Sequence, residues 1–371
     1  MSSPSSSRRA FHEFSGAIPA RTHDAMRGAA RRNDFDALRL AAALAVVIGH
    51  AWPLTGLHPP PTVLGFPVYT LAVYVFFAIS GHLVASSWRR DPHPGRFLAR
   101  RALRILPALV VVVVLTALVV GPLVTTLDAR AYFASPSTWA YLTNVTLVAG
   151  YDLPGVFADN PVSAVNGVLW TLGPEFLCYL AVLAIGSLPR RARIPVALAA
   201  TAALVVLSFA SPWPDWTPAF RAAVFFAGGA ALAVLRRFRL PLVAGALVLI
   251  AWGGVALSVP ELALPAAWLA LPPLVIAAGR ASTPGLRTVG VVGDLSYGSY
   301  LWGFLVQQVV VQLAPGLPLG ADVAIVVVAT LAIAAASWHL VERRALALKP
   351  SGPSRARAGA GGESAHAGAA G

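Results

Sequence analysis

Residues 35–50 read FDALRLAAALAVVIGH, an apolar stretch that opens with an acid and a base and contains a histidine. Its Leu, Ala, Val and Ile residues form a continuous run without alternation, which is typical of a helix that spans a bilayer. Three ionisable residues interrupt this run: Asp36, Arg39 and His50. Ionisable groups at membrane depth cost at least about 2.5–3.5 kcal/mol each on insertion scales, so they usually face a cavity or a partner. The stretch therefore predicts a membrane helix with a polar face.

The composition of the whole chain agrees with this prediction. Of 371 residues, 57% are hydrophobic and only 12% are charged, and the mean hydropathy is +0.71. A soluble protein of this length needs more charge on its surface. Each span must satisfy its own backbone hydrogen bonds in lipid, and the apolar runs lack the alternation of a barrel strand. The sequence predicts an all-α polytopic membrane protein.

We expect about ten transmembrane helices. The apolar stretches lie near residues 37–55, 68–88, 104–126, 167–188, 194–210, 219–235, 240–258, 262–279, 289–313 and 320–341. They make up one domain over residues 34–345. Residues 1–33 and 346–371 are rich in small residues and arginine without an apolar period, so we expect them to be disordered cytoplasmic tails.

The basic residues predict the orientation. If the N-terminus is cytoplasmic, all but two of the 28 Lys and Arg residues fall on the inner side, the exceptions being Arg130 and Arg221. Both termini are then cytoplasmic, and a multi-pass protein of the inner (plasma) membrane is expected. The net charge of +13 is spread over short loop clusters and does not form one basic patch, which argues against a nucleic-acid partner. The single cysteine, Cys178, excludes an internal disulfide.

His50 and Glu175 are the candidate acid/base pair. Arg39 and His50 are eleven residues apart, so they share a helix face with about 16 Å between them along the axis. Glu175, in the stretch LWTLGPEF, enters the fourth span from the outer side to a similar expected depth. The carboxylate would then fix the imidazole tautomer and support its charged form. The alternative is that each residue makes a buried polar contact between helices.

Arginines on the inner side form a second candidate site. Arg101 and Arg104, in RFLARRALRILP, lie on one side of a helix start. With Arg39 they would bind a phosphorylated donor that arrives from the cytoplasm, although ordinary positive-inside charge explains most of this loop. Asp294, at the inner end of the ninth span, is expected to pair with Arg287.

Three further residues are weaker candidates for binding a substrate. His82, in FFAISGHLV, falls inside a span, where a structural role is favoured. Tyr297 and Tyr300 share a helix face and would contact a sugar, but a packed aromatic at an interface is equally consistent with the pattern. We predict no metal site.

Six motifs, in order, resemble those of the integral-membrane acyltransferase-3 family. The first is Arg39 followed by ten residues and His50, preceded by Asp36. The others are VYVFFAISGHLV, RFLARRALRILP, the outer loop with LWTLGPEF, LSYGSYLWG and HLVERRAL. Together they cover about residues 34–345.

The resemblance implies a fold of ten helices and the transfer of an acyl group from cytoplasmic acyl-CoA to a hydroxyl, commonly of a glycan. By position, His50 would be the catalytic histidine and Arg39 its partner in the motif. Arg101 and Arg104 would be the paired arginines, and Glu175 the membrane carboxylate. Acetyl-CoA would act as co-substrate, with no permanently bound cofactor.

The chain also departs from the family pattern. Many members have an acidic residue where this chain has Tyr74, and the usual aromatic after Ser-Gly is His82. A common histidine is replaced by Gly303, and the closing proline by Arg344. These changes affect the contacts of the late spans and leave the motif of the first span intact.

We therefore expect a membrane O-acyltransferase with His50 as base and Glu175 to orient it. The acceptor would be a glycan or a glycosylated small molecule, and a covalent acyl-histidine route stays open. The alternative is a proton-coupled transporter or exporter that uses His50, Glu175 and His82 as a relay.

Overall fold

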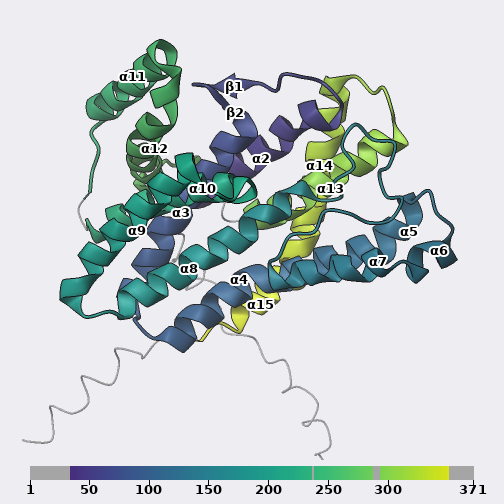
Figure 1. The fold of residues 1–371 in the computed structure, drawn as a ribbon, viewed down its shortest axis with the longest axis horizontal. Helices are drawn as coiled ribbons and strands as arrows, with labels where there is room; N and C mark the ends of the chain where they lie inside the picture. The colour runs from purple at the N-terminus through teal and green to yellow at the C-terminus, as the bar shows by residue number, and fades with distance from the viewer. Residues whose placement is uncertain (1–33, 236–237, 287–292, 351–371) are drawn as a thin grey trace, which may run out of the picture.

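The computed structural model describes residues 34–235, 238–286 and 293–350 (Figure 1). The expected N-terminal tail and Arg287 lie outside these residues, as does the expected C-terminal tail beyond residue 350. The described part of the chain is all-α apart from one small hairpin, in which β1 (Thr62–Val63) pairs antiparallel with β2 (Phe66–Pro67). The fold class predicted from the sequence is confirmed.

Ten longer helices within the described residues correspond to the ten expected spans. They are α2 (Phe35–Leu54), α3 (Val68–Arg90), α4 (Pro94–Leu115), α8 (Leu172–Ser187), α9 (Arg190–Ala210), α10 (Thr217–Val234), α11 (Leu242–Ser258), α12 (Ala263–Arg280), α13 (Ser296–Leu313) and α14 (Leu319–Ser337).

Short elements extend or connect these helices. The α-helical ones are α5 (Gly121–Val124), α6 (Ala129–Ala134), α7 (Pro136–Ala140) and α15 (Arg343–Ala347). The 3₁₀-helices are η2 (Tyr141–Thr146), η3 (Gly167–Thr171), η4 (Pro214–Trp216) and η5 (Pro260–Leu262). Two π-helical turns, η1 (Thr116–Val120) and η7 (Trp338–Glu342), continue α4 and α14.

Within the described ranges, eight helical segments are long and apolar enough to cross a membrane. The remaining two expected spans differ for separate reasons. The α11 helix is apolar but has 17 residues, and α13 carries Gln307, Gln308 and Gln312. All residues of α13 from Ser296 to Gln308 are buried, so this helix lies inside the bundle and does not need a lipid-facing surface.

The centre of the bundle is built from α2, α3, α10 and α13. The α2 helix packs against both α3 and α13, and α3 also packs against α10. Gly81 of α3 and Gly229 of α10 allow the last two backbones to touch, since a Cβ at either position would lie 2.0 Å from a carbonyl oxygen of the other helix. Small residues at such crossings are typical of membrane helices. The α11 and α12 helices stand at one edge of the molecule and α5–α7 at the opposite edge (Figure 1).

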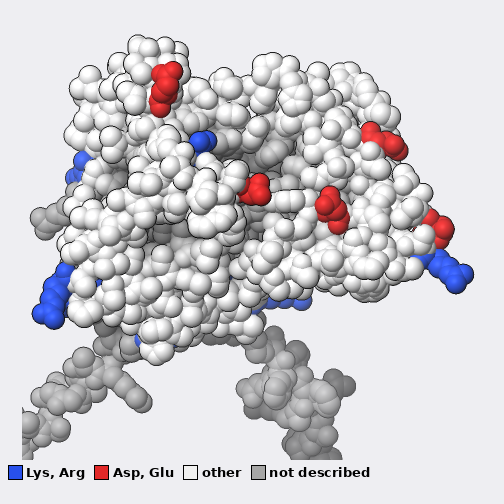
Figure 2. All heavy atoms as spheres, in the orientation of Figure 1, with Lys and Arg blue, Asp and Glu red and all other residues white. Residues whose placement is uncertain are grey.

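The surface is consistent with a lipid environment. On the face drawn in Figure 2, uncharged side chains cover most of the molecule. The α9 and α11 helices, at the periphery, bury few of their residues. Large apolar side chains such as Leu198, Leu242 and Ile250 are accordingly exposed. In water such a surface would be an aggregation hazard, whereas in a bilayer it faces hydrocarbon.

Candidate active site

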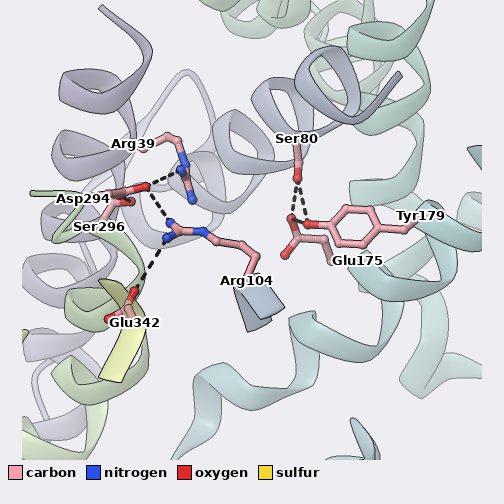
Figure 3. A network of polar contacts seen from close by, with 8 residues as sticks. All are labelled: Arg39, Ser80, Arg104, Glu175, Tyr179, Asp294, Ser296 and Glu342. Carbon is pink, nitrogen blue, oxygen red and sulfur yellow. Dashed lines mark hydrogen bonds and ion pairs between the residues drawn. The ribbon is translucent and has the colours of Figure 1, made fainter. Parts of the chain in front are cut away.

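Two arginines from different helices meet on one carboxylate at the end of the bundle where α2 begins. Arg39 Nη1 lies 2.9 Å from Asp294 Oδ2, and Arg104 Nη2 lies 2.7 Å from the same oxygen (Figure 3). Arg104 Nη1 is 3.6 Å from Glu342 Oε2. This cluster, which we call the inner ion cluster, joins the starts of α2 and α13, the middle of α4 and the end of α14. Of the three arginines expected to form one donor site, the structure brings Arg39 and Arg104 together on Asp294, and their role in binding a donor stays a prediction.

The backbone around Asp294 and Glu342 is irregular, and this irregularity positions both acids. Gly293, just before Asp294, has a φ of +121°, and a Cβ there would lie 2.2 Å from Trp338 Nε1. Only glycine combines that conformation with so close an approach. Glu342 ends the π-helical turn η7, a type of irregularity that often occurs at functional sites. Ser296 Oγ donates to Asp294 Oδ1 at 2.5 Å, and Ser337 Oγ donates to Glu342 Oε1 at 3.0 Å.

Arg101 takes a different direction from Arg104, although only three residues separate them. Its guanidinium lies 6.0 Å from the ring of Phe97 and 5.9 Å from that of Tyr179, which are cation–π contacts. Among the described residues it forms no ion pair, and its buried Nε has no hydrogen-bond partner.

Its neighbours Arg96 and Arg100 both bind Asp91 in the loop before α4. Hydrogen bonds from Arg96 and Arg100 hold the pKa of Asp91 well below its usual range. Among the residues that the structure describes, Arg101 is therefore the one arginine of α4 without a carboxylate in contact.

Glu175 forms a separate polar cluster with residues of α3 and α8. The hydroxyls of Ser80 and Tyr179 both donate to Glu175 Oε1, the latter at 2.6 Å (Figure 3). The Ser80 and Tyr179 oxygens are also 3.2 Å apart. Tyr179 follows Glu175 by four residues, so the two share one face of α8.

His50 lies near the other end of α2, four residues before its last residue. Its Nδ1 is 2.8 Å from the carbonyl oxygen of Val46. A carbonyl can only accept, so Nδ1 carries the proton and the neutral ring keeps its basic lone pair on Nε2. Among the described residues Nε2 has no hydrogen-bond partner, and it is not among the fully buried atoms.

The imidazole of His50 lines a cavity of about 120 Å³. Tyr69 covers the imidazole at a centroid distance of 4.5 Å, and Phe304 meets it edge-on at 5.3 Å. A Cβ at Gly49 would lie 2.9 Å from the backbone nitrogen of Tyr69, so this glycine lets the start of α3 reach the ring. The other lining residues are Thr70, Val73, Tyr74, Val168, Trp170, Pro218 and Tyr300.

The expected pairing of His50 with Glu175 is wrong. On α3, Tyr69 contacts His50 whereas Ser80 binds Glu175. These two α3 residues are eleven positions apart, which places the contacts about 16 Å from each other along the helix axis. The two groups therefore lie at different depths, and the Val46 carbonyl rather than Glu175 sets the imidazole tautomer.

Of the remaining candidate residues, Tyr300 lies at the cavity, whereas Tyr297, His82 and Asp36 do not line it. Tyr300 lines the cavity with His50, and its hydroxyl lies 2.7 Å from Thr171 Oγ1. Tyr297 donates to the carbonyl of Ile105 at 2.8 Å, beside the inner ion cluster. His82 is buried and stacks on Phe35 at 5.8 Å, and it does not line the cavity. Asp36 lies in the first turn of α2.

Sequence reasoning missed part of both polar clusters. Asp294 binds Arg39 and Arg104, whereas its expected partner Arg287 lies outside the described residues. Glu342, Ser80 and Tyr179 were not singled out, although each lies in or beside a quoted motif. The available signal was that Asp294 directly precedes LSYGSYLWG and Glu342 is the acid of HLVERRAL. No group of His, Cys, Asp and Glu suited to a metal ion occurs among the residues that the structure describes.

Comparisons with known proteins agree with the motifs. A family profile described as an acyltransferase domain matches residues 32–339. The chain is 28% identical over 334 residues to an "O-acetyl transferase" of Shigella phage Sf6, and the alignment covers 85% of this chain and 96% of the phage protein. It is 39% identical over 166 residues to "Nodulation protein 10" of Rhizobium leguminosarum bv. viciae, which covers 40% of this chain and 42% of that protein. No solved structure matches the chain significantly.

Proposed function

This chain belongs to the acyltransferase-3 family of integral-membrane enzymes, and on that premise we propose that it transfers an acetyl group from acetyl-CoA to a hydroxyl of a glycan or a glycosylated small molecule. Family membership makes the protein a multi-pass membrane O-acyltransferase. The donor, the base and the class of acceptor are what we add. The transporter alternative has no comparable support.

The main support for the proposal is the tautomer of His50 and its position beside the cavity. Its Nδ1 is committed to the Val46 carbonyl, so Nε2 is free to accept a proton beside the cavity. Imidazole suits this role because its unperturbed pKa lies near neutral pH. The acceptor hydroxyl would enter the cavity and give its proton to Nε2 as its oxygen attacks the thioester carbonyl. The carbon–sulfur bond then breaks, and the proton passes to the departing thiolate of CoA.

The inner arginines are proposed to hold the donor. Arg39 and Arg104 lie in the inner ion cluster and Arg101 lies near it, about three turns of α2 from His50. An extended pantetheine arm covers a comparable distance, so phosphates at the arginines and a thioester at His50 are compatible. Because Asp294 and Glu342 already contact Arg39 and Arg104, a donor phosphate would have to share or displace these carboxylates.

The aromatic walls of the cavity support a sugar as acceptor. Tyr69, Tyr74, Trp170 and Tyr300 all line it, and aromatic faces combined with a few hydroxyls suit the mixed apolar and polar surface of a sugar ring. The arginine end would face the cytoplasm, where CoA is found, in the inner (plasma) membrane.

Purified protein in lipid vesicles with labelled acetyl-CoA tests this function. We expect O-acetylated glycoside and free CoA to form together, and slow hydrolysis of acetyl-CoA when no acceptor is present. Mass spectrometry of surface glycans and secreted metabolites, with and without the protein, would identify the natural acceptor. Gradient-driven uptake of a substrate without any acetylated product would overturn the proposal in favour of a transporter.

A further inference from the structure

A cation beside the cavity is not used by the mechanism above. Arg130 and Arg221 are the two basic residues expected on the outer side of the membrane. Arg130 is exposed on the short helix α6. Arg221 is half-buried in the second turn of α10. Lys and Arg are sparse in the upper part of the face drawn in Figure 2.

The side chain of Arg221 has hydrogen-bonding capacity to spare. Its Nε donates to the carbonyl of Ser208 at 3.2 Å. Across the described ranges its two terminal nitrogens make no hydrogen bond or ion pair, and neither is fully buried. Asp215 in η4, the acid closest in sequence, is not paired with it among those residues. The planar fork of the guanidinium is therefore free for a ligand.

Its position on α10 relates it to the cavity. Pro218, Arg221 and Phe225 are spaced by three and four residues, so they share one face of the helix. Pro218 lines the cavity. Phe225 stacks at 4.3 Å on Tyr74, which also lines the cavity. Arg221 thus lies on α10 between Pro218, which lines the space beside His50, and Phe225, which packs behind Tyr74 in its wall.

We infer that Arg221 binds an oxyanion of the acceptor, a phosphate ester attached close to the hydroxyl that receives the acyl group. A half-buried guanidinium with no counter-charge among the described residues favours such a group, because it offers two parallel charge-assisted hydrogen bonds to phosphate oxygens. A phospholipid headgroup has the same chemistry and is the competing source. The inference rests on the proposed function, since it takes the cavity as the acceptor site.

Matched acceptors and variants test it. The full-length protein in phosphatidylcholine vesicles is assayed with octyl hexosides and with octyl hexosyl phosphates of the same sugars. The wild type is compared with Arg221→Gln, with Arg221→Lys, which keeps the charge without the fork, and with Arg130→Gln as the control cation. Thermal unfolding and acceptor-free hydrolysis of acetyl-CoA are measured for each protein.

We expect Arg221→Gln to raise KM for the phosphate-bearing acceptors by about ten- to a hundredfold, the range for losing a hydrogen bond to a charged group. Arg221→Lys should have a smaller effect. KM for the neutral acceptors and the hydrolysis of acetyl-CoA should not change, and Arg130→Gln should behave as the wild type.

Equal effects of Arg221→Gln on both sets of acceptors, or no effect on either, would overturn the inference. So would an effect that appears only when the vesicles contain anionic phospholipid, because Arg221 would then anchor the helix to headgroups. If the wild type acetylates no acceptor of either set and hydrolyses no acetyl-CoA, the proposed function fails, and the inference fails with it.

Discussion

At the level of single residues, His50 obtains its tautomer from its own helix. The carbonyl of Val46, one turn earlier, accepts from Nδ1 and leaves Nε2 as the base. At the end of the bundle where α2 begins, one oxygen of Asp294 binds both Arg39 and Arg104 and holds the two guanidiniums together. Neither contact is apparent from residue types alone, since a backbone carbonyl carries no sequence signal and Asp294 lies 190 positions from Arg104.

Neutralising Asp294 should destabilise the protein. In Asp294→Asn, Arg39 loses its ionic partner and Arg104 keeps only Glu342. We expect a loss of about 3 kcal/mol in the free energy of unfolding, because removing one member of a buried ion pair leaves an uncompensated charge. Thermal unfolding in detergent measures this loss. Adding Arg39→Met to Asp294→Asn should restore part of the stability, because the unpaired charge is then removed. The control is Asp159→Asn, which changes an exposed carboxylate in a loop. If Asp294→Asn alone is as stable as the wild type, the inner ion cluster does not stabilise the fold.

His82 should be dispensable for chemistry. It stacks on Phe35 and does not line the cavity, so His82→Ala removes a packing contact without touching the proposed base. We expect a lower unfolding temperature and an unchanged rate of acetyl transfer per folded molecule. A drop in that rate comparable to the loss expected for His50→Ala would mean that the second imidazole takes part in the reaction.

At the level of elements, two helix contacts fix the geometry of the centre. The α3 and α10 helices cross in backbone contact at Gly81 and Gly229. The α2 and α13 helices are held together near His50, where a Cβ at Gly303 would lie 2.3 Å from Val47 Cγ2. A side chain at position 303 would therefore require the side chain of Val47 to move.

A pair of glycine substitutions tests the crossing of α3 and α10. Gly81→Ala places a methyl group against the backbone of Phe226, and overpacking of this kind typically costs about 1–3 kcal/mol. A methyl group at Gly254 of α11 would meet no other atom within 4 Å, so Gly254→Ala should be neutral or slightly stabilising. The unfolding temperatures of the two variants are compared with that of the wild type. Equal behaviour of the two would show that the backbones do not touch at Gly81.

The helices were predictable from the sequence, and most of the side-chain partnerships were not. Apolar runs in the sequence correspond to all ten longer helices of the described residues, including the shorter α11 and the buried α13. Depth was the source of the main error. Counting residues from the expected span ends placed His50 and Glu175 at one level, whereas α2 ends four residues after His50 and α3 separates their contacts by eleven positions. The start and end of each helix decide depth, and sequence locates these least well.

At the level of the whole molecule, the inner ion cluster and the cavity occupy different depths of one bundle. The α2 helix carries both Arg39 and His50, and α13 runs beside it from Asp294 to Phe304. Family membership and the apolar surface establish a multi-pass membrane enzyme. The proposal adds a direction: the donor enters at the arginine end and the acceptor meets it at the opposite end.

That direction predicts the topology. In a Cys178→Ala background, cysteine is introduced at Ser137, exposed on α7, or at Arg191, exposed at the start of α9. A membrane-impermeant maleimide should label the first position in intact cells and the second only after permeabilisation, because the basic end of the bundle is expected to face the cytoplasm. The reverse pattern would place the arginines outside, away from CoA.

The most direct test of the central claim replaces the imidazole itself. His50→Ala and His58→Ala, the latter on an exposed loop, are assayed in vesicles for transfer of labelled acetyl groups from acetyl-CoA, after equal folding has been verified by thermal unfolding. Loss of a general base should lower the rate by about 10²–10⁴-fold in His50→Ala and leave His58→Ala unchanged. A His50→Ala protein that folds and transfers acetyl groups at the wild-type rate would contradict the account.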